Sequence, residues 1–345
     1  MKNQSVSSQS MQSIEKNVQK RIGVILVQLG TPDEATPQAV RTYLKEFLSD
    51  PHVIEINKWL WKLILNGIIL RTRPKKSALL YQRLFQTYGP VLKIYSESLA
   101  KKIATDFKEY SHITIDYGMR YGNPSLKAKI EQFVLHDKVT HLMIVPLFPQ
   151  YSNATTGSVY DLAQEVLSRF RFKPALHLFE PFYCKAGYIA STAELINSCI
   201  DSRATPPEKL ILSYHGLPQS YSDRGDPYHE MCLETTKLLS EVIHLPKENI
   251  LHTYQSRFGN QKWLEPALDI TITELAKLGT DDIIVACPAF SMDCLETLDE
   301  VGYEARKLFI ENGGERFELV SCLNDTNNWA TALSKMIFDE LNSWL

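Results

Sequence analysis

Short apolar runs that end at glycine, proline or polar residues recur along the whole chain. They are rich in Val, Ile and Leu, a composition typical of strands buried on both faces of a parallel sheet. We expect strands at 22–29, 113–119, 142–147, 175–180, 209–214, 250–254, 283–287 and 317–321.

Helical patterns separate these runs. We expect helices at 37–48, through Tyr81 and Leu84, and near 229–243, 263–278, 293–312 and 329–345. Strands that alternate with helices predict βαβ units and an α/β fold built on parallel sheets.

Two short sequence echoes divide the chain into similar halves. Each echo lies just after an expected strand: Gly30-Thr31-Pro32 resembles Gly216-Leu217-Pro218, and Arg120-Tyr121-Gly122-Asn123 resembles Arg257-Phe258-Gly259-Asn260. We therefore predict two similar doubly wound, Rossmann-like domains facing a central cleft, at 21–160 and 161–324. Residues 325–345 should form a helix that packs back on the first domain. Residues 1–20 are rich in Ser and Gln and are expected to be disordered.

The first half carries extra residues near 51–95, which we interpret as a flap. An apolar run at 59–70 precedes a basic stretch at 71–76, favouring a ligand with an apolar body and acidic ends. An ordinary surface helix is the alternative. The 12-residue run is too short to cross a bilayer, which takes about 20 residues. Its two tryptophans suggest the hypothesis that the flap contacts the inner membrane surface peripherally.

Composition excludes several functions. The net charge of −3 gives no sign of a nucleic-acid partner. Six cysteines without a Cys-x-x-Cys pair favour a reduced, cytoplasmic protein and no iron–sulfur cluster. The sequence has no phosphate loop, nucleophile elbow or dinucleotide fingerprint.

Candidate chemistry lies at the ends of two expected strands. His215 ends one apolar run, and Glu296 follows another at the start of an acidic helix. Ligands of open α/β sheets bind outside the carboxyl ends of the strands. We therefore predict that His215 and Glu296 face each other across the cleft and handle a metal ion. A packed or capping role for the histidine is the alternative.

A row of carboxylates continues from this point. Asp293, Glu296, Glu300 and Glu304 are spaced three, four and four residues apart, which places them on one face of an α-helix. Carboxylates can pass hard cations and protons along such a row. A solvated helix face is the alternative interpretation.

Taken together, the motifs resemble the ferrochelatase family from about Arg21 to Asn324. The blocks that carry the resemblance are Leu29-Gly30-Thr31-Pro32, Glu46-Phe47-Leu48-Ser49-Asp50, Met119-Arg120-Tyr121-Gly122-Asn123-Pro124, Pro149-Gln150-Tyr151-Ser152, Ser213-Tyr214-His215-Gly216-Leu217-Pro218, Gly225-Asp226-Pro227-Tyr228, Gln255-Ser256-Arg257-Phe258-Gly259 with Trp263-Leu264, and Cys287-Pro288 through Asp293-Cys294-Leu295-Glu296-Thr297-Leu298.

The resemblance implies a lyase that inserts Fe²⁺ into protoporphyrin IX, releases two protons and completes haem biosynthesis. It implies that His215 and Glu296 bind the iron and act catalytically, with His215 as base, ligand or both. Asp293, Glu300 and Glu304 would relay ions or protons. The implied porphyrin contacts are Leu29, Arg73, Lys76, Tyr81, Arg120, Tyr121, Trp263 and Phe290. No cofactor beyond the substrate iron is implied.

Three alternatives remain beside this interpretation. A relative could use coproporphyrin III instead, although the apolar flap favours the less acidic protoporphyrin. A porphyrin or haem carrier without catalysis is a second alternative, against which the intact His215 and Glu296 argue. A cobalt or nickel chelatase for other tetrapyrroles would share the two-domain fold. Tyr88-Gly89-Pro90 also departs from the family pattern, since the usual serine before the proline is absent.

Overall fold

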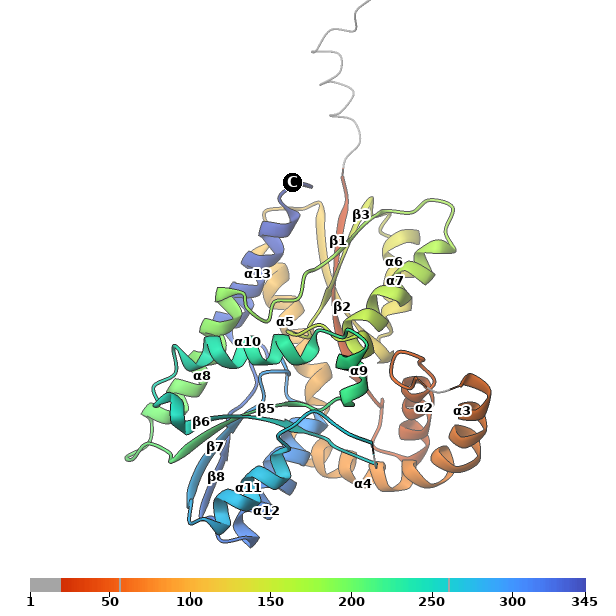
Figure 1. The fold of residues 1–345 in the computed structure, drawn as a ribbon. Helices are drawn as coiled ribbons and strands as arrows, with labels where there is room; N and C mark the ends of the chain where they lie inside the picture. Colours follow the sequence, from red (N-terminus) through yellow and green to blue (C-terminus); the bar gives the residue numbers. More distant parts are fainter. Residues whose placement is uncertain (1–19, 56, 260) are drawn as a thin grey trace, which may run out of the picture.

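The computed structural model describes residues 20–55, 57–259 and 261–345 of the 345-residue chain. Except for Lys20, the expected disordered tail lies outside the described residues. Within them the chain forms two four-stranded parallel sheets (Figure 1). The first has the order β2-β1-β3-β4, from β1 (Ile22–Thr31), β2 (Ile113–Gly122), β3 (His141–Pro146) and β4 (Ala175–Leu178). The second has the order β6-β5-β7-β8, from β5 (Lys209–His215), β6 (Ile250–Gln255), β7 (Asp282–Ala286) and β8 (Arg316–Leu319).

The two sheets have the same strand order, which confirms the prediction of two similar doubly wound domains. Gly30 lies near the end of the central strand β1, and Gly216 follows the equivalent strand β5. Arg120 lies near the end of β2, and Arg257 follows the equivalent strand β6. The two sequence echoes therefore mark equivalent points of the two domains.

The expected boundary between residues 160 and 161 is wrong. It falls inside α7 (Ser158–Ser168), the helix that crosses from β3 to β4, and β4 pairs with β3 in the first sheet. The alternation of apolar runs and helical patterns predicts each strand, but it does not predict the sheet to which the strand belongs. Without a linker signal, the sequence pattern did not show where the first sheet ends.

Each sheet has one face covered by its own helices. These are α6 (Leu126–Leu135) and α7 on the first sheet, and α11 (Leu268–Lys277) and α12 (Arg306–Glu311) on the second. The opposite faces of both sheets contribute to one shared apolar core. This core also includes side chains of α5 (Val91–Asp106), α8 (Ala186–Asp201), α10 (Tyr228–Ser240) and α13 (Asn327–Leu341).

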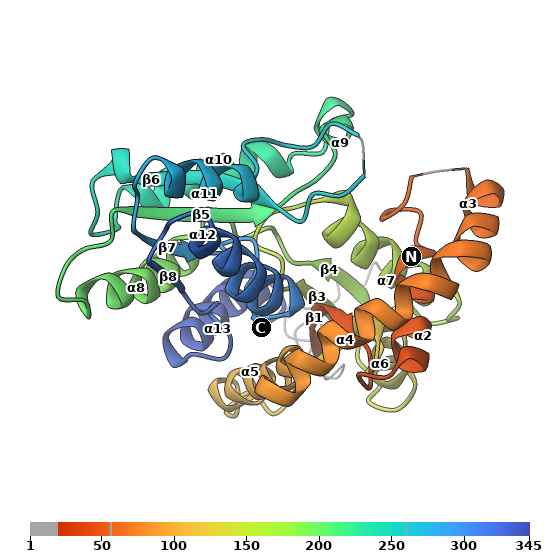
Figure 2. The ribbon, with the colours of Figure 1, turned by 90° about the horizontal axis from the view of Figure 1, so that it is seen from below.

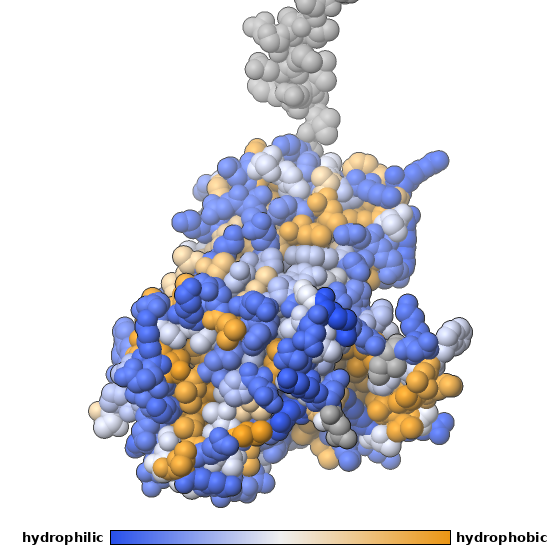
Figure 3. Space-filling model, viewed as in Figure 1, coloured by the Kyte–Doolittle hydropathy of each residue, from blue (hydrophilic) through white to orange (hydrophobic). Residues whose placement is uncertain are grey.

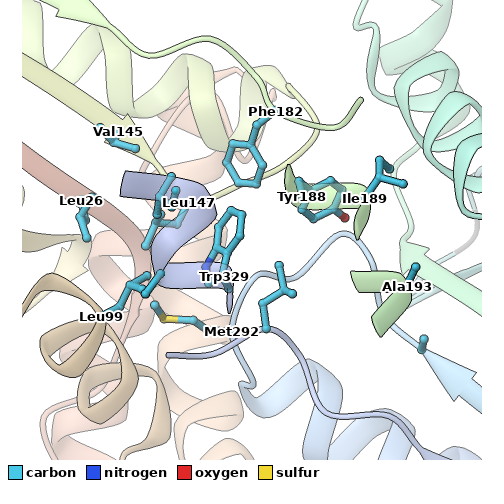
Figure 4. Close-up of a cluster of buried hydrophobic side chains, with 14 of the residues drawn as sticks. Leu26, Leu99, Val145, Leu147, Phe182, Tyr188, Ile189, Ala193, Met292 and Trp329 are labelled. Atoms are coloured by element: carbon cyan, nitrogen blue, oxygen red, sulfur yellow. The ribbon is translucent and has the colours of Figure 1, made fainter. Parts of the chain in front are cut away.

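The last helix joins the domains through this core. Helix α13 follows the last strand of the second sheet, yet it packs on α5 of the first domain and on α8. Trp329 of α13 is fully buried, with its ring 5.4 Å from Phe182 and 6.2 Å from Tyr188 (Figure 4). Because these residues belong to one apolar cluster, the core holds the two domains together.

The flap is helical and lies at the first domain's side of the molecule (Figure 2). A small apolar core of its own holds it, including Val40, Leu70 and Tyr81. Its elements are α3 (Lys58–Ile64), the π-helix η1 (Leu65–Ile69) and α4 (Leu70–Tyr88), and α2 (Pro37–Leu48), which precedes the flap, packs on α4. The remaining short elements are the π-helices η2 (Asn153–Gly157) and η4 (Leu295–Ala305), the helix α9 (Gln219–Asp223) and the 3-10 helix η3 (Lys247–Asn249).

Candidate active site

His215 is the last residue of β5 and is partly buried. Its Nδ1 lies 2.7 Å from the carbonyl oxygen of Gly216. A carbonyl can only accept, so Nδ1 donates its proton, and in the neutral ring Nε2 carries the lone pair. The imidazole ring lies 6.2 Å from the ring of Phe290. His215 is therefore oriented so that Nε2 can take a proton or bind a metal ion.

Glu296 is the second residue of η4, and Gln255 fixes the backbone there. The Gln255 amide donates to the Glu296 carbonyl oxygen at 2.9 Å and accepts from Ser213 Oγ at 2.9 Å. Gln255 also pairs with His215 in the sheet register. This side chain, only 3% exposed, ties β5 to η4. The sequence analysis did not single it out, although a polar residue ending an apolar strand was the available signal.

Glu300, which is also on η4, interacts electrostatically with His215 and Glu296. Its Oε2 accepts from Ser256 Oγ at 2.8 Å. Burial raises the pKa of Glu300, while His215 and the Ser256 hydrogen bond act against this rise and the nearby Glu296 adds to it. Gln255 pairs with His215 in the sheet and binds the Glu296 backbone, and Ser256 binds Glu300, so these contacts hold the start of η4 beside the end of β5. A carboxyl with a raised pKa is suited to exchanging protons closer to neutral pH.

The helix that carries these carboxylates differs from the predicted one. We expected an α-helix over 293–312, but η4 begins at Leu295 as a π-helix and α12 follows it. Hydrogen bonds from i to i+5 widen each turn. Residues four apart therefore come closer to one line than in an α-helix, which keeps Glu296 and Glu300 on one side. Hydrophobic spacing does not reveal this helix type.

The two ends of the predicted carboxylate row are bound by protein groups. Asp293 precedes η4, is 3% exposed, and accepts from Asn324 Nδ2 at 2.7 Å and Thr297 Oγ1 at 3.0 Å. Glu304 pairs with Arg83 of α4 at 3.0 Å. The relay roles of Asp293 and Glu304 remain predictions, whereas their contacts here favour anchoring of the π-helix.

Two tyrosines of the first domain, Tyr43 and Tyr81, interact electrostatically with Glu296. Burial raises the pKa of both Tyr43 and Tyr81, and the nearby Glu296 carboxylate adds to each rise. Leu29, near the end of β1, packs against the same flap core, as do Leu295 and other apolar residues of η4. Glu296 therefore lies where the two domains meet.

Arg120 and Tyr121 are held inside the first domain. The Tyr121 hydroxyl donates to Asp50 Oδ2 at 2.7 Å, Arg120 pairs with the same carboxylate, and Ser158 Oγ donates to it at 2.7 Å. Burial alone would raise the pKa of Asp50, but hydrogen bonds, led by those from Ser158 and His52, outweigh it and lower the pKa. Tyr121 is fully buried. Asp50 is thus the anchor of this cluster, a role that the sequence analysis missed.

The other expected porphyrin residues are also dispersed. Trp263 is 5% exposed and donates from Nε1 to the Phe258 carbonyl oxygen at 2.9 Å. Arg73 and Lys76 are exposed on α4. The structure thus places Phe290 beside His215 and packs Leu29 in the same apolar cluster as Tyr81, whereas Tyr81, Tyr121 and Trp263 are all buried. Among the described residues, no three His, Cys, Asp or Glu side chains form a ready metal cage.

Paired sheets with a histidine and a carboxylate near the carboxyl ends of two strands define the class of two-domain, chelatase-like α/β proteins. A family model described as Ferrochelatase matches residues 21–341. The Ferrochelatase of Rhodopseudomonas palustris strain BisB5 is 43% identical over 328 residues, covering 94% of this chain and 95% of the relative. The Ferrochelatase of Bradyrhizobium diazoefficiens is 41% identical over 340 residues and covers 98% of each chain. This chain belongs to the ferrochelatase family.

Solved structures agree on the fold. The chain resembles SirB from Bacillus subtilis with Fe³⁺ at a TM-score of 0.55 and 12% identity, covering 94% of this chain and 97% of that one. It resembles CbiX, described as the terminal enzyme of sirohaem biosynthesis in denitrifying bacteria, at 0.52 and 11%, covering 93% and 99%. These likenesses show the two-domain fold alone.

Proposed function

We propose that this enzyme inserts Fe²⁺ into protoporphyrin IX to form haem b, releasing two protons, as the last step of haem biosynthesis. The observation that carries the proposal is that Gln255, which pairs with His215 in the sheet, donates to the Glu296 carbonyl oxygen and so ties the end of β5 to the start of η4. Membership in the ferrochelatase family, with relatives above 40% identity over nearly the whole chain, supports the same reaction.

The contacts suggest how the residues divide the work. In the neutral His215 ring, Nε2 carries the lone pair and can accept a pyrrole proton as Fe²⁺ enters the macrocycle. Glu296 would hold and deliver the Fe²⁺, since carboxylate oxygens suit a divalent cation. Glu300, whose pKa is raised by burial, would pass released protons away. A site complementary to a bent macrocycle, whose nitrogens are exposed, would lower the barrier further.

Anaerobic metallation is the direct test. Fe²⁺ is offered with protoporphyrin IX or coproporphyrin III to wild type and to His215→Ala. We expect wild type to metallate protoporphyrin faster, and the variant to lose about 10²–10⁴-fold in kcat. Preference for coproporphyrin would overturn the substrate assignment but keep the reaction. Tight porphyrin binding without metallation by wild type would mean a carrier.

We further propose that the flap rests peripherally on the cytoplasmic face of the inner membrane. Trp59 is 79% exposed, Leu63 73% and Ile68 60%, and basic residues follow them on α4. Figure 3 shows hydrophobic side chains gathered on the surface at α3. No helix in the described ranges is long and apolar enough to span a membrane. An apolar face with a basic rim is suited to lying in the headgroup region.

Co-sedimentation with vesicles of anionic and neutral phospholipid tests this placement. We expect Trp59→Ser combined with Leu63→Ser to weaken sedimentation. The matched control is Leu278→Ser, because Leu278 is 84% exposed in the second domain, away from the flap. Equal sedimentation of both variants and wild type would contradict membrane contact through the flap.

We also propose that the enzyme works without a resident iron–sulfur cluster. The absorption spectrum and iron content of protein purified anaerobically test this point. A cluster spectrum with stoichiometric iron and sulfide would overturn it.

A further inference from the structure

Arg83 of the flap binds side chains of η4, the π-helix that carries Glu296. Its Nε lies 2.5 Å from Asp299 Oδ1, and its Nη2 lies 3.0 Å from Glu304 Oε1. The guanidinium carbon also lies 3.9 Å from the centre of the Tyr303 ring. All three partners belong to η4, whereas Arg83 belongs to α4. A single side chain therefore connects the flap to the π-helix by two ion pairs and one cation–π contact.

The two elements that Arg83 joins both carry residues of the candidate site and pack against each other. Helix α4 carries Tyr81, and η4 carries Glu296. Tyr81 belongs to the apolar cluster against which Leu295 and Leu298, on either side of Glu296, also pack. Arg83 is only two residues after Tyr81 in the chain. A shift of η4 along α4 would therefore move Glu296 relative to both Tyr81 and His215.

We propose that Arg83 is a positioning residue for metal insertion, which holds the π-helix so that Glu296 and Glu300 stay turned toward His215. The proposal rests on the function proposed above. The planar guanidinium suits this role because its fork can bind two carboxylates at once, which a lysine ammonium matches less well. It also occupies Glu304, leaving the inner pair, Glu296 and Glu300, to handle iron and protons.

The main difficulty for a test is that Asp299 is only 6% exposed. Removing Arg83 alone leaves a buried carboxylate without its partner, which destabilises the fold whatever the role of Arg83. A second variant removes this effect: Arg83→Gln with Asp299→Asn leaves no unpaired buried charge. Arg83→Lys retains the charge but not the fork.

The chain offers a matched control at the far end of the second sheet. Arg203 forms the same kind of two-armed ion pair, with Asp282 at 2.5 Å and Glu318 at 3.0 Å, and Asp282 is also buried. Asp282 additionally pairs with the exposed Arg316 at 3.1 Å. Both carboxylates lie outside η4, Asp282 in β7 and Glu318 in β8. Arg203→Gln with Asp282→Asn therefore perturbs a comparable ion pair without touching the π-helix.

The measurements are Tm, kcat and the separate KM values for Fe²⁺ and protoporphyrin IX, together with calorimetric Fe²⁺ binding without porphyrin. For Arg83→Gln with Asp299→Asn we expect a Tm near wild type. We also expect at least a tenfold lower kcat/KM for Fe²⁺, weaker Fe²⁺ binding and an unchanged porphyrin KM. Arg83→Lys should recover part of the loss. The Arg203 control should likewise keep a Tm near wild type, and it should leave the KM for Fe²⁺ unchanged.

If the double variant regains the wild-type Fe²⁺ affinity and kcat along with its Tm, Arg83 is structural only and the proposal is wrong. An equal loss in the Arg203 control would also overturn it. Failure of the proposed function is distinguishable, because wild type itself would then form no haem. In that case, calorimetric Fe²⁺ binding by the variants would still show whether Arg83 affects the affinity for Fe²⁺.

Discussion

The two domains share a scaffold but place different side chains at equivalent points. The central strands β1 and β5 both lead into a glycine, and a π-helix follows the third strand of each sheet. Before that glycine stands His215 in the second domain and Leu29 in the first. The second residue of the π-helix is Glu296 in the second domain and Ala154 in the first.

This difference separates what the fold supplies from what the side chains supply. Both domains present the same positions at the ends of their strands, yet one half places a base and a carboxylate there and the other places two apolar residues. On the function proposed above, an apolar macrocycle would pack against the apolar half, because it would bury apolar surface there without desolvating unpaired polar groups. The second domain would then act on the ring nitrogens.

Copying the first domain into the second is the strongest test. Glu296→Ala installs the residue that stands at the equivalent position, Ala154. We expect kcat for iron insertion to fall about 10²–10⁴-fold, since the carboxylate that we propose delivers the iron is gone. Binding of protoporphyrin, followed by fluorescence quenching, should change little. Glu311→Ala, at an exposed site of α12, is the control. A normal kcat in Glu296→Ala would show that the asymmetry between the halves is not catalytic.

The polar cluster of the first domain should matter for stability. Asp50 accepts from Arg120, Tyr121, Ser158 and His52 in a site where it is 6% exposed. Asp50→Ala leaves these donors unpaired, and we expect a loss of about 3 kcal/mol in the free energy of unfolding. Urea denaturation measures it.

Asp161 provides the comparison for this cluster. It pairs with the other ring nitrogen of His52 but its side chain is 67% exposed. Asp161→Ala should therefore change the unfolding free energy by about 0.5 kcal/mol or less. Equal effects of the two substitutions would contradict an anchoring role specific to Asp50.

The sequence predicted strands better than the relations between elements. All eight expected strands are present within a few residues, because a buried parallel strand is a local apolar run bounded by turn residues. The sheet to which β4 belongs is set by pairing with β3, which leaves no local signal. The π-helical form of η4 was equally hidden, since its residues have the same amphipathic spacing as an α-helix.

The candidate site was also only partly predictable from the sequence. His215 and Glu296 were predicted because each follows a strand and lies in a block that resembles the family. The engagement of Glu304 depends on Arg83, which is 221 residues away in the chain. The burial of Tyr121 depends on Asp50, 71 residues away. Partners at such separations follow from the packed fold rather than from local spacing.

A milder test concerns the apolar counterpart of His215. Leu29→Ala removes part of the apolar surface that we expect against the macrocycle. The KM for protoporphyrin should rise up to about tenfold, which corresponds to about 1.4 kcal/mol, with kcat largely retained. Leu278→Ala, an exposed position in the second domain, controls for general effects of truncation. A large fall in kcat at unchanged KM would mean that Leu29 acts on the reaction step and not on binding.

The smallest expected effect concerns Glu300, on the π-helix η4 of the second domain, and the way in which stability changes with pH. The pKa of Glu300 is raised by burial, so the folded state binds its proton more tightly than the unfolded state does. The stability from this group is fully present below the unfolded pKa and is lost as pH rises through the folded pKa. Glu300→Gln should therefore be more stable than wild type at pH 8, by about 2–4 °C in Tm, and the advantage should shrink toward pH 4. Glu311→Gln, at an exposed site, should show no such trend. An advantage that grows on acidification would mean that Glu300 is stabilised as a carboxylate, and its place as the proton outlet would be lost.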